Sequence, residues 1–334
     1  MLHPPLLSLL LCLTLAACGG GGGSSPTVSA DPPSGSDLPD SSPPSPPPDS
    51  EIPPPTANNL LTEIVGNLQA PRDIIFGPAD SELSDELFVV NFVGVEATWV
   101  RNFATDSPRL QPIQNSLVGA IAVDIDQSGR FFFACLTPIM GSNIGVVTVR
   151  RFDSSVDDFQ YRGVSGPIGL ALGPQGGLYV ANRDARSVTR IDFADGASPD
   201  GHLFDTVAQD LQFDDGELPA HLLVNPDGRL FICETAANRI QTWTEEDGLQ
   251  LFATSDQKLN RPVGIARRPN GNLLITNHGD GRIVELNSQG ALQNSFDTGL
   301  GADQLYGIAV RTDGQVYVVA DRDGDGTLYR MELE

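Results

Sequence analysis

Short apolar runs alternate with polar turns from about residue 60 to the end of the chain. One unit has an apolar run at 167–171, a second at 178–182 and a third, alternating run at 187–191. Strands buried on both faces read as continuous apolar runs, whereas strands with one solvated face alternate. The dipeptides Asp227-Gly228, Asn270-Gly271 and Asp313-Gly314 signal hairpin turns between such runs. Because no segment has a sustained helical period, the pattern predicts an all-β domain.

This unit occurs six times, with anchor residues spaced 43 to 52 residues apart. Repeats of about 40–50 residues with three or four strands are typical of β-propellers, so we predict six blades. The sixth unit stops after its third run at Glu334, whereas the run 60–65 precedes the first unit. We expect this run to supply the outer strand of blade six and to close the ring. The anchors are Ile74, Ile121, Leu170, Leu222, Ile265 and Ile308.

The unit has the form Pro-x-Gly-Ile-Ala, then Gly-x-Leu-Tyr-Val-x-Asn, then Arg-Ile. This form resembles the NHL repeat, over nearly all of the globular part of the chain. The resemblance implies a six-bladed propeller related to the gluconolactonase and TolB-like propellers. It implies little about function, because one fold hosts many activities.

The first 17 residues read as a signal peptide. The apolar run 6–17 is too short to span a bilayer and has the length of a signal-peptide apolar region. It ends Leu15-Ala16-Ala17-Cys18, which resembles the lipobox of bacterial lipoproteins, although no Lys or Arg precedes the run. The resemblance implies lipidation at Cys18 and a cell-envelope location, in the outer membrane of a Gram-negative host because Gly19 follows. A secretory signal with a chance cysteine is the alternative.

Residues 18–57 are rich in Gly, Ser, Pro and Asp and contain proline clusters at 43–48 and 53–55. Such a segment has too little apolar surface to offset its ordering entropy, and its prolines favour extended polyproline II structure. We therefore predict a signal peptide at 1–17, a lipidated, disordered tether at 18–57 and the propeller at 58–334.

The formal net charge of −23 argues against a nucleic-acid partner, because phosphate binding needs a basic surface. The propeller sequence contains two cysteines, Cys135 and Cys233, which fall in different repeats. We expect both to be buried thiols without a disulfide.

Polar residues occur where the chain enters each innermost strand and leaves each second strand. In NHL-like propellers these two positions share one face, and propellers bind ligands at such a central mouth. The candidate rim residues are Arg72, Asp73, Asn91, Asn182, Arg183, His221, Glu234, Asn277 and His278.

Two of these residues form the candidate catalytic pair. His221 replaces the glycine of the repeat, and the register places Glu234 at the neighbouring strand end, so the two could perform acid–base chemistry. A hydrogen-bonded structural histidine is the alternative. We expect His278 to be an exposed turn residue. Arg72 and Asp73 break the repeat in blade one and predict either recognition of a carboxylate or sugar, or a rim ion pair.

The loop Asp321-Arg322-Asp323-Gly324-Asp325-Gly326, with Glu332, formally matches a calcium-binding pattern. No helix flanks it, because residues 327–333 alternate like a strand. The loop therefore predicts either a Ca²⁺ ion bound by Asp321, Asp323 and Asp325, which would rigidify the turn, or an ordinary hairpin.

Lactonases of the gluconolactonase type take metal ligands from positions that are apolar or aromatic here, at 167–169, 262–264 and 306–307. Lyases of the peptidyl-hydroxyglycine type need several histidines, and only His221 lies near such a position. The leading interpretation is thus an envelope lipoprotein that binds a protein, peptide or glycan without catalysis. The alternative is a lactonase-like hydrolase or lyase that uses His221 and Glu234 at the central mouth.

Overall fold

The computed structural model describes residues 60–93, 96–115, 119–136, 145–152, 159–161, 163–174, 176–192, 209–213 and 218–333. The predicted signal peptide, Cys18 and the tether lie outside these residues and stay predictions. Among the described residues, no helix has the length and apolar character needed to cross a membrane.

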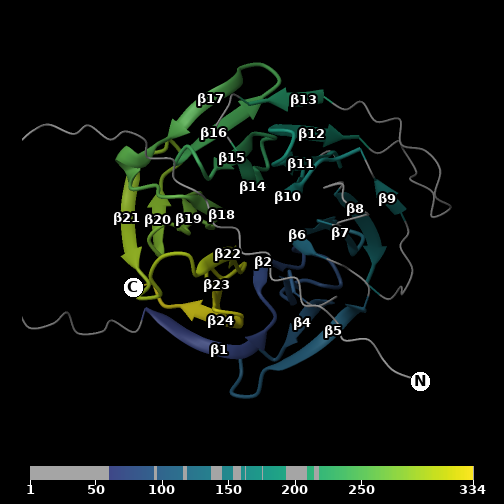
Figure 1. Cartoon of the computed structure of the whole chain (residues 1–334). Helices are drawn as coiled ribbons and strands as arrows, with labels where there is room; N and C mark the ends of the chain where they lie inside the picture. Colours follow the sequence, from purple (N-terminus) through teal and green to yellow (C-terminus); the bar gives the residue numbers. More distant parts are fainter. Residues whose placement is uncertain are drawn as a thin grey trace, which may run out of the picture. The chain divides into compact units, whose positions relative to one another are not determined.

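Six four-stranded antiparallel sheets make up the described part of the chain and form a six-bladed propeller (Figure 1). The innermost strands contact one another in the order β2, β6, β10, β14, β18, β22 and back to β2. They surround the centre of the ring, as Figure 1 shows. The predicted all-β class and blade number are confirmed.

The first three blades run in chain order from the centre outward. Blade one contains β2 (Pro71–Phe76), β3 (Leu87–Asn91), β4 (Glu96–Arg101) and β5 (Arg109–Asn115). Blade two contains β6 (Ala120–Ile125), β7 (Arg130–Cys135), β8 (Val146–Arg151) and β9 (Phe159–Tyr161). Blade three contains β10 (Pro167–Leu172), β11 (Leu178–Asn182), β12 (Ser187–Ile191) and β13 (Gln209–Gln212).

The last three blades follow the same order, except that blade six takes its outer strand from the start of the propeller. Blade four contains β14 (Pro219–Val224), β15 (Leu230–Glu234), β16 (Arg239–Thr244) and β17 (Gly248–Ala253), followed by the 3₁₀ turn η1 (Ser255–Gln257). Blade five contains β18 (Pro262–Arg267), β19 (Leu273–Asn277), β20 (Arg282–Leu286) and β21 (Leu292–Asp297). Blade six contains β22 (Leu305–Val310), β23 (Val316–Arg322), β24 (Asp325–Met331) and β1 (Leu61–Leu68).

The N-terminal strand β1 closes the ring as predicted. It pairs antiparallel with β24, from Leu61 opposite Met331 to Leu68 opposite Gly326. A Cβ at Gly326 would lie 2.3 Å from Pro71 Cδ, so glycine permits the close approach of blade six to blade one. The two ends of the propeller sequence are thereby joined in one sheet.

The core lies between adjacent blades. The second strands β3, β11, β15 and β19 are buried at every position, which explains their continuous apolar sequence. One cluster, for example, joins Phe132 of blade two to Leu170 and Val180 of blade three. Cys135 and Cys233 are buried in separate blades and form no disulfide, as expected.

The predicted hairpin turns are present. Gly228, Gly271 and Gly314 have φ angles of 87°, 88° and 91°, and each amide donates to the carbonyl three residues earlier. Only glycine adopts this backbone region without strain, so these dipeptides fix the turn between first and second strands.

In blade two the structural anchor differs from the predicted one. Ile74 pairs with Val89 in blade one, and the corresponding pair in blade two is Val123 with Phe133. The anchor is therefore Val123 rather than Ile121. Blade two lacks the proline that begins the innermost strand of most other blades, so its register has no fixed point in the amino-acid sequence.

Candidate functional site

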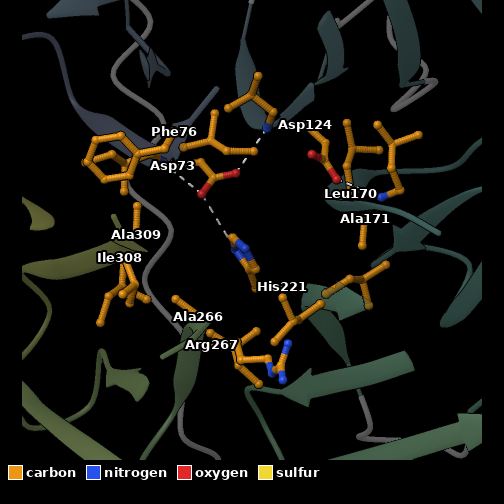
Figure 2. A pocket seen from close by; sticks show the side chains of 18 of the residues that line it. Asp73, Phe76, Asp124, Leu170, Ala171, His221, Ala266, Arg267, Ile308 and Ala309 are labelled. Atoms are coloured by element: carbon orange, nitrogen blue, oxygen red, sulfur yellow. Dashed lines mark hydrogen bonds and ion pairs between the residues drawn. The ribbon is translucent and has the colours of Figure 1, made fainter. Parts of the chain in front are cut away.

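A cavity of about 400 Å³ occupies the centre of the ring and is lined by all six innermost strands (Figure 2). We call it the central channel. It runs from Asp73 and His221 toward the carboxyl ends of the strands at Phe76, Leu172 and Val224. Hydrophobic side chains make up most of the wall. The polar residues of the wall are Asp73, Asp124, His221, Arg267 and Thr312.

Asp73 lies near the start of β2, where the β2–β3 register shifts between Pro71 and Asp73. Its side chain is 3% exposed. Its Oδ1 accepts from the Ile74 amide at 2.9 Å, and its Oδ2 accepts from the Val123 amide of the next blade at 3.0 Å. The carboxylate therefore ties β2 to β6. Burial raises the pKa of Asp73, while His221 and these two amides oppose the rise.

His221 faces Asp73 across the channel (Figure 2). Its Nδ1 lies 3.9 Å from Asp73 Oδ1, although the residues belong to opposite blades, four and one. Both occupy the same position of the repeat. The other blades carry Ala122, Gly169, Gly264 and Gly307 there.

Asp124 is a third titratable residue of the cavity, and sequence reasoning missed it. Its Oδ1 accepts from the Ile125 amide and its Oδ2 from the Leu172 amide of blade three, both at 2.7 Å. Burial raises the pKa of Asp124 to about 7, and the neighbouring charge of Asp73 adds to the rise. The correct anchor in blade two, Val123, would have placed Asp124 on the channel.

Glu234 does not form the predicted pair with His221. It is fully buried at the end of β15, and its Oε2 lies 2.7 Å from Arg239 Nε on the next strand outward. The carboxylate that faces His221 is Asp73 instead. The prediction considered only neighbours within one blade, whereas the contact crosses the ring.

The three asparagines expected at the rim are buried and hold the chain together. Asn277 accepts from the Asn260 amide at 3.1 Å and donates to the Lys258 carbonyl at 2.7 Å, which fixes the loop that enters β18. Asn182 and Asn91 donate to threonine hydroxyls of the neighbouring strand, Thr189 at 2.7 Å and Thr98 at 3.0 Å. Their side-chain amides thus hold neighbouring strands of a blade together and are not exposed at the rim.

The prediction that His278 is an exposed turn residue is wrong. Its side chain is buried, its Nδ1 lies 3.0 Å from the Leu305 carbonyl oxygen, and its ring packs 4.7 Å from that of Tyr306. Burial lowers its pKa, although the Leu305 carbonyl opposes this. The innermost strand of the next blade covers the turn, which a local sequence pattern does not reveal.

The arginines of the rim are engaged in ion pairs. Arg72 Nη1 lies 3.0 Å from Asp321 Oδ2, and its guanidinium stacks 4.1 Å from the Tyr306 ring. The sequence predicted that Arg72 either recognises a carboxylate or sugar or forms an ion pair at the rim, and the structure contains the ion pair. Arg183 pairs with its neighbour Asp184 at 2.8 Å.

The calcium pattern folds as a tight hairpin turn between β23 and β24. Asp323 and Gly324 occupy the turn with φ angles of 54° and 92°. Asp321 accepts from the Gly324 amide through Oδ1 and pairs with Arg72 through Oδ2. Among the described residues, no three His, Cys, Asp or Glu side chains gather so as to hold a metal ion. The geometry therefore does not support the calcium loop.

The same finding applies to a metal in the central channel, which the gluconolactonase resemblance implies. Both oxygens of Asp73 and of Asp124 face backbone amides. In blades three, five and six the positions equivalent to Asp73 are glycines and those equivalent to Asp124 are alanines, which offer no metal ligand. These residues do not fit a metal centre of that kind.

No protein-family model and no curated protein matches the chain. Solved structures match its fold. A streptogramin B lyase has a TM-score of 0.57 at 12% identity, covering 81% of this chain and 97% of the lyase. A gluconolactonase from Xanthomonas campestris scores 0.58 at 14% identity, covering 81% and 89%. Regucalcin, a calcium-binding protein from Agrobacterium tumefaciens, scores 0.59 at 14% identity, covering 80% and 91%. The chain thus has a six-bladed β-propeller fold similar to those of lyases and gluconolactonases.

Proposed function

We propose that the central channel takes up a small organic molecule and that His221, paired with Asp73, performs acid–base chemistry on it. The observation that carries the proposal is the approach of these two side chains across the ring, 3.9 Å apart, in a cavity of about 400 Å³. A volume in this range suits a small-molecule ligand.

The pair divides the work between its two members. Asp73 is held in place by two backbone amides, so it can orient the imidazole with the proton on Nδ1. The other ring nitrogen, Nε2, then accepts a proton from the substrate or from water. A separation of 3.9 Å is longer than a hydrogen bond, and such contacts tighten when a substrate closes the site.

Asp124 supplies a second titratable group. Because burial raises its pKa to about 7, a protonated carboxyl and a carboxylate are both present near neutral pH. Acid–base catalysis usually depends on two titratable groups whose surroundings give them different pKa values, so that one acts as the acid and the other as the base. In hydrolysis of an ester or lactone, one group takes a proton from the attacking water and the other gives a proton to the alkoxide that leaves as the acyl C–O bond breaks. In an elimination, one group removes the proton from carbon and the other protonates the leaving group as its bond to the adjacent carbon breaks. The fold of the lyase and gluconolactonase neighbours is consistent with both reaction classes.

A second candidate, binding without catalysis, is favoured by a different observation. Asp73 and Asp124 each accept a hydrogen bond from a backbone amide of the next blade. Both carboxylates therefore stabilise the contact between neighbouring innermost strands. Under this alternative the channel holds its ligand and His221 contributes only a hydrogen bond.

A panel of aryl esters, lactones and cyclic depsipeptides, incubated with the full chain and with His221→Gln, separates the two candidates. Turnover by the wild type that falls at least about a hundredfold in His221→Gln supports the enzyme, since acid–base groups contribute about 10²–10⁴-fold. Saturable binding by calorimetry without turnover, weakened by no more than about fivefold in His221→Gln, supports binding alone, because one hydrogen bond accounts for a loss of that size.

We also propose that the propeller is tethered to the cell envelope through lipid on Cys18. The run Leu15-Ala16-Ala17-Cys18 and the proline-rich segment after it support this location. Cells fed radiolabelled palmitate should label the wild-type protein and not Cys18→Ala. Equal labelling of both proteins, or none of either, would reject the lipoprotein assignment.

A further inference from the structure

A second cavity, of about 440 Å³, lies at the outer seam between blades three and four. We call it the seam pocket. The walls come from the turns that follow β10, β14 and β16 and from side chains of β11, β12 and β16. Its lining includes Gly173, Tyr179, Arg190, Asp227, Trp243 and Glu245.

The same seam between blades six and one is filled. There Tyr317, at the repeat position of Tyr179, packs edge-on against the rings of Phe76 at 5.5 Å and Phe103 at 5.4 Å. Arg311 lies over the Phe103 ring at 5.9 Å. At the seam between blades six and one, side chains of the protein itself therefore pack around the tyrosine equivalent to Tyr179.

The filling residues are replaced in the seam pocket. By register, Phe76 corresponds to Val224, Phe103 to Glu246, and Arg311 to Gly173. Two rings and one guanidinium are thus exchanged for a smaller side chain, an exposed carboxylate and a glycine. In the opposite direction, Val100 of the filled seam is exchanged for Trp243. The two seams are therefore packed differently around equivalent tyrosines, and the one at Tyr179 has a hollow beside it.

A polar group inside the pocket has no partner. Tyr179 is 7% exposed, and its hydroxyl makes no hydrogen bond within the described part of the chain. The hydroxyl is not enclosed by protein, so a molecule bound in the pocket can take the place of solvent as its hydrogen-bond partner. The Trp243 ring meets the Tyr179 ring edge-on at a centroid distance of 6.2 Å.

The charges at the pocket favour a cation. Asp227, Glu245 and Glu246 lie on its lining, against the single guanidinium of Arg190. Arg190 spans the seam, with Nε 2.8 Å from Asp192 and Nη1 2.7 Å from Glu245 of blade four. Glu245 is 73% exposed, so this contact is weak and exchangeable.

We propose that the seam pocket binds a small organic cation with N–H donors, an alkylguanidinium or a primary amine. One N–H group donates to the free Tyr179 hydroxyl, and the positive charge lies against the aromatic rings and the Glu245 carboxylate. Arg190 shows that this surface accommodates a guanidinium, since its own lies 5.9 Å from the Tyr179 ring centroid.

The test uses agmatine as the probe and the full chain in a Trp99→Phe background. The chain has two tryptophans, so the fluorescence then reports Trp243 alone. We expect a saturable change with agmatine that weakens as salt is raised, and none with 1-pentanol or glucose.

Matched variants locate the site. Tyr179→Phe removes only the hydroxyl and should weaken binding about fivefold, the value of one hydrogen bond. Gly173→Leu should abolish binding by filling the hollow. Tyr317→Phe, the equivalent change in the filled seam, should leave the affinity within twofold. Circular dichroism confirms that each variant is folded.

Three results would overturn the inference. They are no saturation with agmatine at millimolar concentrations, wild-type affinity in both Tyr179→Phe and Gly173→Leu, or saturation by glucose in place of agmatine. None of these results depends on turnover in the central channel, so the two proposals can fail separately.

Discussion

Asp73 of blade one and His221 of blade four occupy the same position of the repeat and meet across the channel, with Oδ1 and Nδ1 3.9 Å apart. In a ring of six, the first and fourth blades are opposite. Two large polar side chains at a position that is glycine or alanine elsewhere therefore point toward one another. The contact is a property of the ring, because no single blade contains both members.

The glycines at this position allow the innermost strands to approach closely, and Gly169→Ala tests this. A Cβ at Gly169 would lie 2.0 Å from the Ala220 carbonyl oxygen of the next blade. We expect the free energy of unfolding to fall by about 1–3 kcal/mol, the usual cost of overpacking. Urea denaturation measures it. Gly173→Ala is the control, because its Cβ would meet nothing closer than 3.4 Å. An equal loss in both variants would refute the steric explanation.

Asp124→Asn should change how stability depends on pH. The pKa of Asp124 is raised by burial from 3.8 to about 7, so the folded protein binds this proton more tightly than the unfolded chain. The contribution of Asp124 to stability therefore falls as the pH rises from about 4 to about 7, and it no longer changes above that range. Because asparagine does not titrate, the stability of the variant relative to the wild type should increase between about pH 4 and 7.

Asp126→Asn is the control, because the pKa of Asp126 is shifted in the opposite direction to that of Asp124. Burial acts to raise the pKa of Asp126, but hydrogen bonds from Ser128 and Arg130 outweigh it and lower the pKa. The stability from Asp126 is thus lost as pH falls. Urea midpoints at pH 4.5, 6 and 8 distinguish the variants. Parallel curves for Asp124→Asn and the wild type would show that Asp124 is not the buried titrating group.

Truncation tests the closure of the ring. A chain that begins at residue 60 should unfold at the same temperature as one that begins at residue 18. A chain that begins at residue 69 loses β1, including Leu68, which is 2% exposed, and the packing of Ile64 and Val65. We expect it to be less stable by at least about 4 kcal/mol, from the burial of these side chains. Equal melting temperatures for all three chains would contradict the role of β1.

The sequence was sufficient for the architecture because the repeat carries it. Alternating runs, turn glycines such as Gly271 and the spacing of the anchors define the blades, and the lone strand before Ile74 has only one unfilled place to occupy. These signals are local and occur several times, so an error in one blade does not alter the fold. The two-residue error of register at Ile121 illustrates this, since the number of blades was still correct.

The candidate site was harder to predict, because its contacts are between blades. Asp73 and His221 were both recognised as departures from the repeat, but His221 was assigned to Glu234 in its own blade. Glu234 is held by Arg239, a residue that local register does place beside it. Asp124 escaped notice because the error at Ile121 moved it off the channel. Asn277 is held by the loop that enters β18, and His278 is covered by the innermost strand of the next blade. The local sequence pattern contains neither contact.

The most direct test of the account is a double-mutant cycle over His221 and Asp73, measured as kcat/KM on the best substrate of the panel. The four proteins are the wild type, His221→Gln, Asp73→Asn and the double variant, with His278→Gln as a control at a buried histidine outside the channel. If the two residues act as one unit, His221→Gln lowers kcat/KM at least about a hundredfold, Asp73→Asn lowers it at least about tenfold, and the double change costs no more than the worse single change. Independent effects that multiply, or a wild-type rate in His221→Gln, would contradict the acid–base pair.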